Sequence, residues 1–158
     1  MFMGNNNRGF TLIELLVVIC IIGILSAVGV VAYNGYTSSA KINATKTIHA
    51  QTVKYISAEL QKCSSGEETV LENLSCSGIH AKKIVSHIGS NGKIFSDRNS
   101  FTYDTYAVQT GDGFQLGEVR LKSLKSKIIV NSCMNYDCSS SDIISDTISL
   151  EEILALKR

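Results

Sequence analysis

An apolar run over residues 10–33 constrains this chain more than any other feature. Thr11, Glu14 and Ser26 are the polar side chains within it. A helix of about 20 residues, rising about 1.5 Å per residue, crosses a hydrocarbon core about 30 Å thick. The run therefore predicts a membrane-spanning helix near the N-terminus, followed by a sequence of ordinary soluble character.

The segment before the run, residues 1–9, is short and hydrophilic, and it carries Arg8. An ordinary secretory signal has a small-residue cleavage site after an apolar region of about 7–15 residues. Here the apolar run is longer, and the hydrophilic segment precedes it. By the positive-inside rule, Arg8 predicts a cytoplasmic leader and an exported C-terminus.

Glu14 is the unusual residue of the run, because a carboxylate at bilayer depth is costly and calls for a partner. A cut between Gly9 and Phe10 would create an α-amine one helical turn away. Such an amine has an unperturbed pKa of about 8 and is cationic at neutral pH. A subunit offset along a filament could bring its own Phe10 amine to a neighbour's Glu14. Taken alone, Glu14 could equally lie near the headgroups at the end of a signal anchor.

The stretch RGFTLIELLVVICIIGILSAVGVVAY closely resembles the N-terminus of the type IV pilin and pseudopilin family. The resemblance covers about the first third of the chain. It implies that a prepilin peptidase cuts after Gly9 and methylates Phe10, and that Glu14 neutralises an adjacent subunit's terminal amine. Implied partners are further copies of the chain in a helical homopolymer and the inner-membrane pilus assembly machinery. The precursor would lie in the bacterial inner membrane and the mature subunit in an extracellular pilus.

Val31 occupies the position where many major pilins have a helix-kinking proline, and this chain contains no proline. Gly23, Gly29 and Gly35 are the weak points that remain, each costing about 1 kcal/mol in a helix relative to alanine. Gly23 suits close packing between helices. Partial melting of residues 23–31 in the assembled filament is a hypothesis.

Apolar spacing continues the helix beyond the run. Ile42, His49, Val53, Ile56 and Leu60 fall on one face, which predicts an amphipathic segment docked on a globular head. One helix is expected from about Phe10 to Lys62. His49 is interpreted as a partly buried packing residue rather than a ligand.

The remaining sequence predicts an α+β head in which three or four antiparallel strands pack on the long helix. The expected strands are residues 101–107, 114–121 and 127–132, with a hairpin turn at 111–113 and a short helix at 80–88. Ser149 and Glu152 form a possible capping box before a terminal helix, although a fourth strand could begin at Thr147 instead. The predicted organisation is a leader (1–9), an apolar helix (10–33), its amphipathic continuation (34–62) and a head (63–158).

Five cysteines divide between the two parts of the chain. Cys20 lies in the apolar run as a small apolar residue, and four lie in the soluble part: Cys63, Cys76, Cys133 and Cys138. An exported domain with four cysteines is expected to form two disulfides. Proximity favours Cys63–Cys76 and Cys133–Cys138, although three connectivities are possible. The Cys133–Cys138 loop resembles the disulfide-bounded C-terminal region that pilins expose on the filament.

Other site chemistries receive weaker support. Zinc could use Cys133, Cys138 and a histidine, but an exported protein oxidises its thiols. Calcium could use Asp137, Asp142 and Asp146, whose spacing matches no recognised loop. DNA could contact the only basic cluster, although a solvated hairpin is the simpler interpretation. The cluster is Arg120, Lys122, Lys125 and Lys127.

These observations predict a structural subunit of a type IV pilus, with no cofactor, metal or catalytic site and no enzymatic activity. The filament could support adhesion, motility or DNA uptake. A pseudopilin of a type II secretion system is the main alternative, and two expected disulfides favour the pilin. A monomeric membrane-anchored binding or enzymatic domain is a third interpretation. It predicts no cleavage at Gly9 and no effect of Glu14→Ala.

Overall fold

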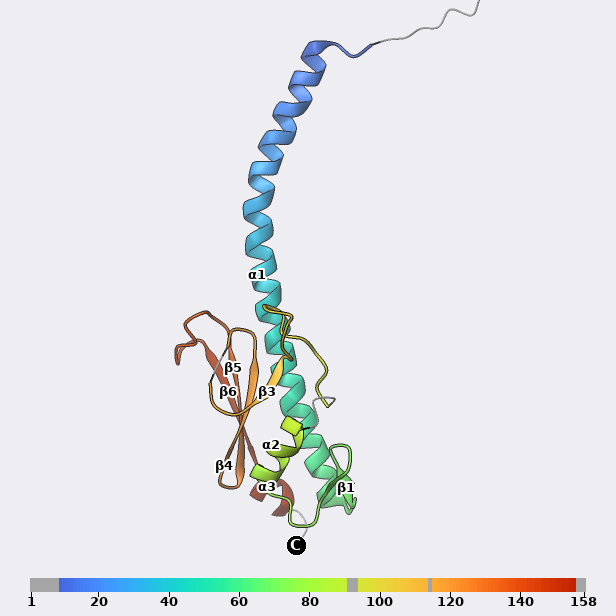
Figure 1. Ribbon diagram of the computed structural model, residues 1–158, viewed down its shortest axis with the longest axis vertical. Helices are drawn as coiled ribbons and strands as arrows, with labels where there is room; N and C mark the ends of the chain where they lie inside the picture. Colours follow the sequence, from blue (N-terminus) through green and yellow to red (C-terminus); the bar gives the residue numbers. More distant parts are fainter. Residues whose placement is uncertain (1–8, 91–93, 114, 156–158) are drawn as a thin grey trace, which may run out of the picture. The chain divides into compact units, whose positions relative to one another are not determined.

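The structure, a computed structural model, describes residues 9–90, 94–113 and 115–155. The chain forms two compact units that meet between Ser39 and Ala40. Helix α1 (Leu12–Ser65) contributes to both units (Figure 1). Its bounds confirm the predicted long helix to within three residues at each end.

The first unit contains the apolar part of α1. Its large side chains are exposed, among them Ile13, Leu25 and Val31. Among the described residues, α1 is the one helix whose length and composition would allow it to cross a membrane. The helix is continuous through residues 23–31 in the single chain. Melting of this segment was proposed for the assembled filament, and it stays a prediction.

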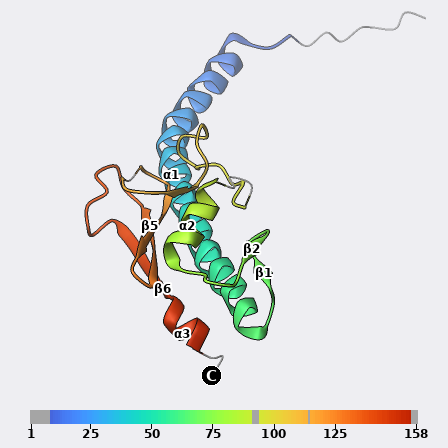
Figure 2. The same cartoon turned by 60° about the horizontal axis from the view of Figure 1, so that its bottom comes forward.

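In the second unit, one face of α1 is buried against the head, as the amphipathic pattern predicts. The buried residues of this face include Thr45, His49, Ile56 and Leu60. The head contains a four-stranded sheet in the order β3-β4-β5-β6; Figure 2 labels its neighbouring strands β5 and β6. Its strands are β3 (Val108–Thr110), β4 (Val119–Leu124), β5 (Lys127–Cys133) and β6 (Ile143–Ser149).

The core lies between α1, the inner face of the sheet and helix α2 (Ala81–Ser90), which confirms the predicted short helix. Fully buried side chains come from each of these elements: Ile56, Leu60, Ile84, Leu121, Ile128 and Val130. Burying such aliphatic side chains contributes about 1.5–3 kcal/mol each. The α+β fold therefore depends on apolar faces that the helical and strand periodicities of the sequence create.

A small hairpin that the sequence-based prediction missed follows α1. Strands β1 (Thr69–Val70) and β2 (Leu74–Ser75) pair antiparallel across a turn of three residues with positive φ: Leu71, Glu72 and Asn73. The Leu71 side chain is fully buried. Non-glycine residues rarely adopt this conformation, so tertiary contacts must stabilise the turn.

The predicted strand over residues 101–107 is wrong. The segment is a series of turns in which Tyr103 has a φ of 58°. Asn99 is fully buried and holds these turns by its side chain. Its Oδ1 accepts the Phe101 N–H at 2.9 Å, and its Nδ2 donates to the Leu116 carbonyl at 2.9 Å. These hydrogen bonds satisfy backbone groups that a strand ladder would otherwise have used.

The predicted hairpin at 111–113 is also wrong, because β3 and β4 are parallel. Gly111 and Gly113 do have positive φ, but the chain continues through a longer connection before β4 begins at Val119. The second strand therefore starts later than expected. Of the residues predicted for it, Phe114 lies outside the described residues.

The C-terminal part agrees better with prediction. β5 matches the predicted third strand, and it pairs antiparallel with β4 and β6. Both alternatives for the tail are present, because β6 leads directly into helix α3 (Leu150–Leu154). Ser149 is the residue preceding α3, but its side chain makes no capping hydrogen bond, so the predicted capping box is not formed.

Candidate assembly site

Thr11 and Glu14 form a capping box at the start of α1. The Glu14 N–H donates to Thr11 Oγ1 at 3.3 Å, and Glu14 Oε2 accepts the Thr11 N–H at 2.8 Å. The Thr11 hydroxyl donates to the same oxygen at 2.8 Å. A threonine followed three residues later by glutamate is the sequence signature of this motif. The signal was present in the sequence, but the prediction placed a capping box only at Ser149.

The capping box gives Glu14 hydrogen-bond donors within its own chain. Both bonds go to Oε2, and among the described residues no hydrogen bond to Oε1 is present. An ionised carboxylate has about four acceptor positions. A cationic group from another molecule can therefore approach Glu14 while Thr11 remains bound.

Gly9 and Phe10 lie directly before α1 in backbone without regular structure. Both are exposed, and Phe10 is 88% exposed. The peptide bond between them is thus outside the helical hydrogen-bond ladder and accessible to a protease. Cleavage there would leave Phe10 as the N-terminus, on the same short segment as Glu14.

Two disulfides are present in the second unit, Cys63–Cys76 and Cys133–Cys138. The first disulfide ties the end of α1 to the segment after β2. The second closes a short loop at the end of β5, between cysteines five residues apart in sequence. In the chain-entropy model a closed loop of about 15 residues stabilises a fold by about 3 kcal/mol. Cys20 is unpaired and exposed in the apolar part of α1.

The metal sites weighed from sequence are not assembled. Cys133 and Cys138 are consumed by their disulfide, which removes the thiolates that zinc would require. Asp142 accepts a hydrogen bond from Ser139 at 2.7 Å, and Asp146 contacts His49. Within residues 9–90, 94–113 and 115–155, no group of three or more potential metal ligands converges.

His49 has a more specific role than packing. Its Nε2 lies 2.9 Å from Asp146 Oδ2 and its Nδ1 lies 2.6 Å from Ser132 Oγ. Because an ionised carboxylate can only accept, Nε2 donates to Asp146 Oδ2, while Nδ1 and the Ser132 hydroxyl share a hydrogen bond. Ser132 is fully buried, so no substrate reaches it. These side chains link α1 to β5 and β6.

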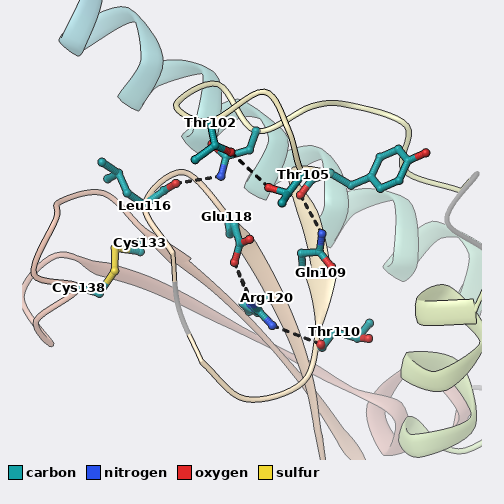
Figure 3. Close-up of polar contacts among 11 residues, drawn as sticks. Thr102, Thr105, Gln109, Thr110, Leu116, Glu118, Arg120, Cys133 and Cys138 are labelled. Atoms are coloured by element: carbon teal, nitrogen blue, oxygen red, sulfur yellow. Dashed lines mark hydrogen bonds and ion pairs between the residues drawn. A yellow bond between two sulfur atoms is a disulfide. The ribbon is translucent and has the colours of Figure 1, made fainter.

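Two members of the predicted basic cluster pair with acids of the head, one of them buried and the other exposed. Arg120 contacts the buried Glu118 carboxylate at 2.9 Å and donates to the Thr110 carbonyl at 3.4 Å (Figure 3). Lys122 pairs with Asp112 at 2.5 Å. Because acids of the same chain pair with these cations, the cluster offers less positive charge to a polyanion than its sequence suggests.

Comparison with known proteins places the chain's similarity at its N-terminus. The prokaryotic N-terminal methylation motif matches residues 4–30. The type IV major pilin protein PilE1 of Neisseria gonorrhoeae is 51% identical over 41 residues, covering 26% of this chain and 25% of the relative. The fimbrial protein of Moraxella nonliquefaciens is 48% identical over 44 residues, covering 28% and 29%.

A further relative is the prepilin peptidase-dependent protein D of Escherichia coli (strain K12), which is 58% identical over 38 residues, covering 24% of this chain and 26% of the relative. The chain thus spans about a quarter of the length of the curated relatives it matches. No solved structure matches it. The matched motif includes the capping box and most of the apolar part of α1.

Proposed function

We propose that this chain is a structural subunit of a type IV pilus, cut after Gly9 by a prepilin peptidase; the N-terminal methylation motif over residues 4–30 and the similarity to type IV major pilins support this. The observation that carries the proposal is the order of features at the N-terminus. An exposed Gly9–Phe10 bond directly precedes a helix long and apolar enough to cross a membrane. Glu14 then lies four residues beyond the new N-terminus.

The apolar part of α1 supports assembly by its exposed surface. In the precursor this surface would be covered by the lipid of the inner membrane, and in a pilus by the same segments of neighbouring subunits. Removing apolar surface from water contributes about 25 cal/mol per Å². A subunit leaving the membrane therefore needs an apolar environment of equal extent, which a bundle of such helices provides.

Glu14 supports the register of that bundle. In the proposed filament, the Phe10 amine of one subunit contacts Glu14 of another, with Oε1 accepting while Thr11 holds Oε2. The contact neutralises two charges that would otherwise be isolated among apolar helices. In this proposal the capping box serves the single subunit in the membrane, and the amine completes the site on assembly.

The proposal is tested by mass spectrometry of the mature N-terminus combined with electron microscopy of sheared cell-surface material. The expected result is a chain that begins with methylated Phe10 and is recovered from fibres. Recovery of the mature chain only from the cell envelope, in short assemblies of a secretion machine, would favour the pseudopilin. An uncut chain that remains monomeric in the membrane would contradict both.

A further inference from the structure

The part of α1 that belongs to the second unit carries a regular exposed ridge. Every fourth residue lies on one row of a helix surface. From residue 46 onward this row alternates lysine with alanine, and all five members are exposed: Lys46, Ala50, Lys54, Ala58 and Lys62. We call these five residues the lysine ridge. Its small alanines leave space between the cations for the side chains of another surface.

The lysine ridge is not balanced by acids on its own helix. No aspartate or glutamate occurs from residue 40 to 58. Lys62 pairs with Glu59, the first acid beyond that segment. Among the described residues, no ion pair joins Lys46 or Lys54. The ridge therefore presents positive charge that the folded chain leaves largely uncompensated.

The opposite charge gathers around the C-terminal end of α1. Glu67, Glu68 and Glu72 are all exposed. The Glu67 N–H donates to the Lys62 carbonyl at 3.1 Å, which places this acidic segment directly against the last turn of the helix. Lys54 precedes the helix end at Ser65 by about 16 Å at about 1.5 Å per residue. Lys46 and Lys54 thus lie farther toward the start of α1 than Glu67 and Glu68, whereas the hydrogen bond from the Leu71 N–H to Glu59 places Glu72 beside the last turns of the helix.

We propose that the lysine ridge is a docking surface for the acidic segment of a second copy of this chain, formed by Glu67, Glu68 and Glu72. This inference rests on the proposed filament. Displacing one copy along α1 by roughly 15–20 Å brings its acids level with the middle of the neighbour's ridge. Because two different surfaces meet, the contact repeats from copy to copy and builds an open polymer rather than a closed dimer.

The chemistry of the contact assigns it a role in register more than in affinity. Exposed ion pairs contribute little singly, but complementary charge rejects the wrong alignment of two surfaces. In a uniformly apolar bundle, neighbouring helices can slide past one another with little change in contact. Lysines spaced eight residues apart recur about every 12 Å along the helix, so they favour particular offsets. The ridge would thus fix the axial offset of neighbouring heads.

Charge reversal tests the proposal in the full chain. Lys46→Glu/Lys54→Glu should lower the yield of filaments at least about fivefold, because each reversal replaces an attraction by a repulsion. Lys82→Glu/Lys127→Glu, on exposed positions of α2 and β5, changes the net charge equally and should leave the yield unchanged. Adding Glu67→Lys/Glu68→Lys/Glu72→Lys to the first variant should restore filaments.

The amount of each variant in the membrane fraction and the oxidation of its two disulfides check that folding is intact. Wild-type yield from the folded Lys46→Glu/Lys54→Glu chain, or failure of the added reversals to restore it, would overturn the docking surface and leave the filament proposal standing. Absence of filaments and of cleavage at Gly9 in the wild-type chain would instead refute the filament proposal. The two failures are therefore distinguishable.

Zero-length carbodiimide coupling provides a direct readout. Filaments grown from mixed ¹⁴N- and ¹⁵N-labelled cells should yield mixed-isotope peptides that join Lys46 or Lys54 to Glu67, Glu68 or Glu72. Mixed isotopes show that the linked residues come from different copies. Links from ridge lysines of one copy only to other carboxylates of another copy would contradict the proposed docking surface. Crosslinks from the ridge to a different protein or to nucleic acid, obtained with a reagent suited to that partner, would contradict it as well.

Discussion

Glu59 Oε2 accepts the backbone N–H of Leu71 at 2.8 Å, which joins the last turns of α1 to the tip of the β1–β2 hairpin. The carbonyl oxygen of Leu71 lies 2.8 Å from His87 Nε2 on α2. Both polar groups of the Leu71 peptide unit are therefore held by side chains from two helices. This arrangement explains how three consecutive residues keep a positive φ without glycine.

Acid should weaken this contact. Burial of the Glu59 carboxyl opposes ionisation, but hydrogen bonds from Lys62 and from the Leu71 N–H outweigh it and hold the pKa of Glu59 below the usual value of 4.5. A depressed folded pKa gives stability that is present above the unfolded pKa and lost as pH falls through the folded one. Thermal unfolding of the full chain in detergent should therefore show a midpoint that drops below about pH 4.5, and Glu59→Gln should reduce that drop.

Glu59→Ala should be more damaging than Glu59→Gln at neutral pH. Alanine leaves the buried Leu71 N–H without a partner, at a cost of about 1–3 kcal/mol, whereas glutamine retains an acceptor oxygen. Chemical denaturation of the full chain measures the difference. Equal stability of the two variants would show that the hydrogen bond to Leu71 does not support the hairpin.

Glu14→Ala should leave the chain in the membrane but abolish filaments, since the proposed acceptor for a neighbour's amine is lost. Immunoblots of membrane fractions and microscopy of sheared material separate the two effects. Glu14→Asp is the matched control, because it keeps the charge while shortening the reach to Thr11. Filaments at normal yield from Glu14→Ala would refute the assembly role.

Thr11→Val should loosen the first turn of α1 while leaving Glu14 ionisable. Loss of an N-cap hydroxyl costs about 0.5–2 kcal/mol of helix stability. Hydrogen exchange at the start of α1 should rise, and Thr11→Ser should restore protection because serine provides the same hydroxyl. Unchanged exchange in Thr11→Val would mean that the capping box does not persist in solution.

His49→Leu should destabilise the head by about 1–3 kcal/mol, because it leaves the fully buried Ser132 hydroxyl without its partner. Adding Ser132→Ala removes that orphaned group, so the double variant should recover part of the loss. Denaturation of both variants provides the comparison. Additive losses would indicate that the hydrogen bond between the two side chains contributes nothing.

Gly117→Ala should cost more than Gly113→Ala. Both glycines have positive φ, at 79° and 105°. A Cβ on Gly117 would lie 2.5 Å from Asn99 Oδ1 and 2.5 Å from the Phe101 ring, whereas one on Gly113 would meet nothing within 4 Å. The difference in unfolding free energy between the variants isolates the steric clash from backbone strain. Equal losses would show that the 99–101 turn yields freely.

The sequence predicted most reliably where one local pattern decides the structure. The apolar run and its period of 3.6 define α1, and alternating residues in 127–133 define β5. The proposed N-terminal site, which stays a prediction, also rests on local sequence, since Gly9, Phe10 and Glu14 are close together in the chain. The Thr11 cap could have been found in the same way.

Prediction failed where distant groups compete for the backbone. Residues 101–107 alternate like a strand, yet the buried Asn99 amide folds them into turns. Glycines at 111 and 113 suggest a hairpin, but β3 pairs with β4 in parallel. The hydrogen bond from Asn99 Nδ2 to the Leu116 carbonyl, and the parallel pairing of β3 with β4, join residues whose proximity no local pattern reveals.

By itself, the sequence determined the long helix, the N-terminal methylation motif and the presence of an α+β head, because these follow from local apolar spacing and adjacent residues. The tertiary structure decided the partners of His49, the positive-φ turn held by Glu59, and the parallel pairing of β3. Those features depend on which polar groups meet when the core closes. The burial of apolar faces fixes that closure, and each polar group must then find a partner within it.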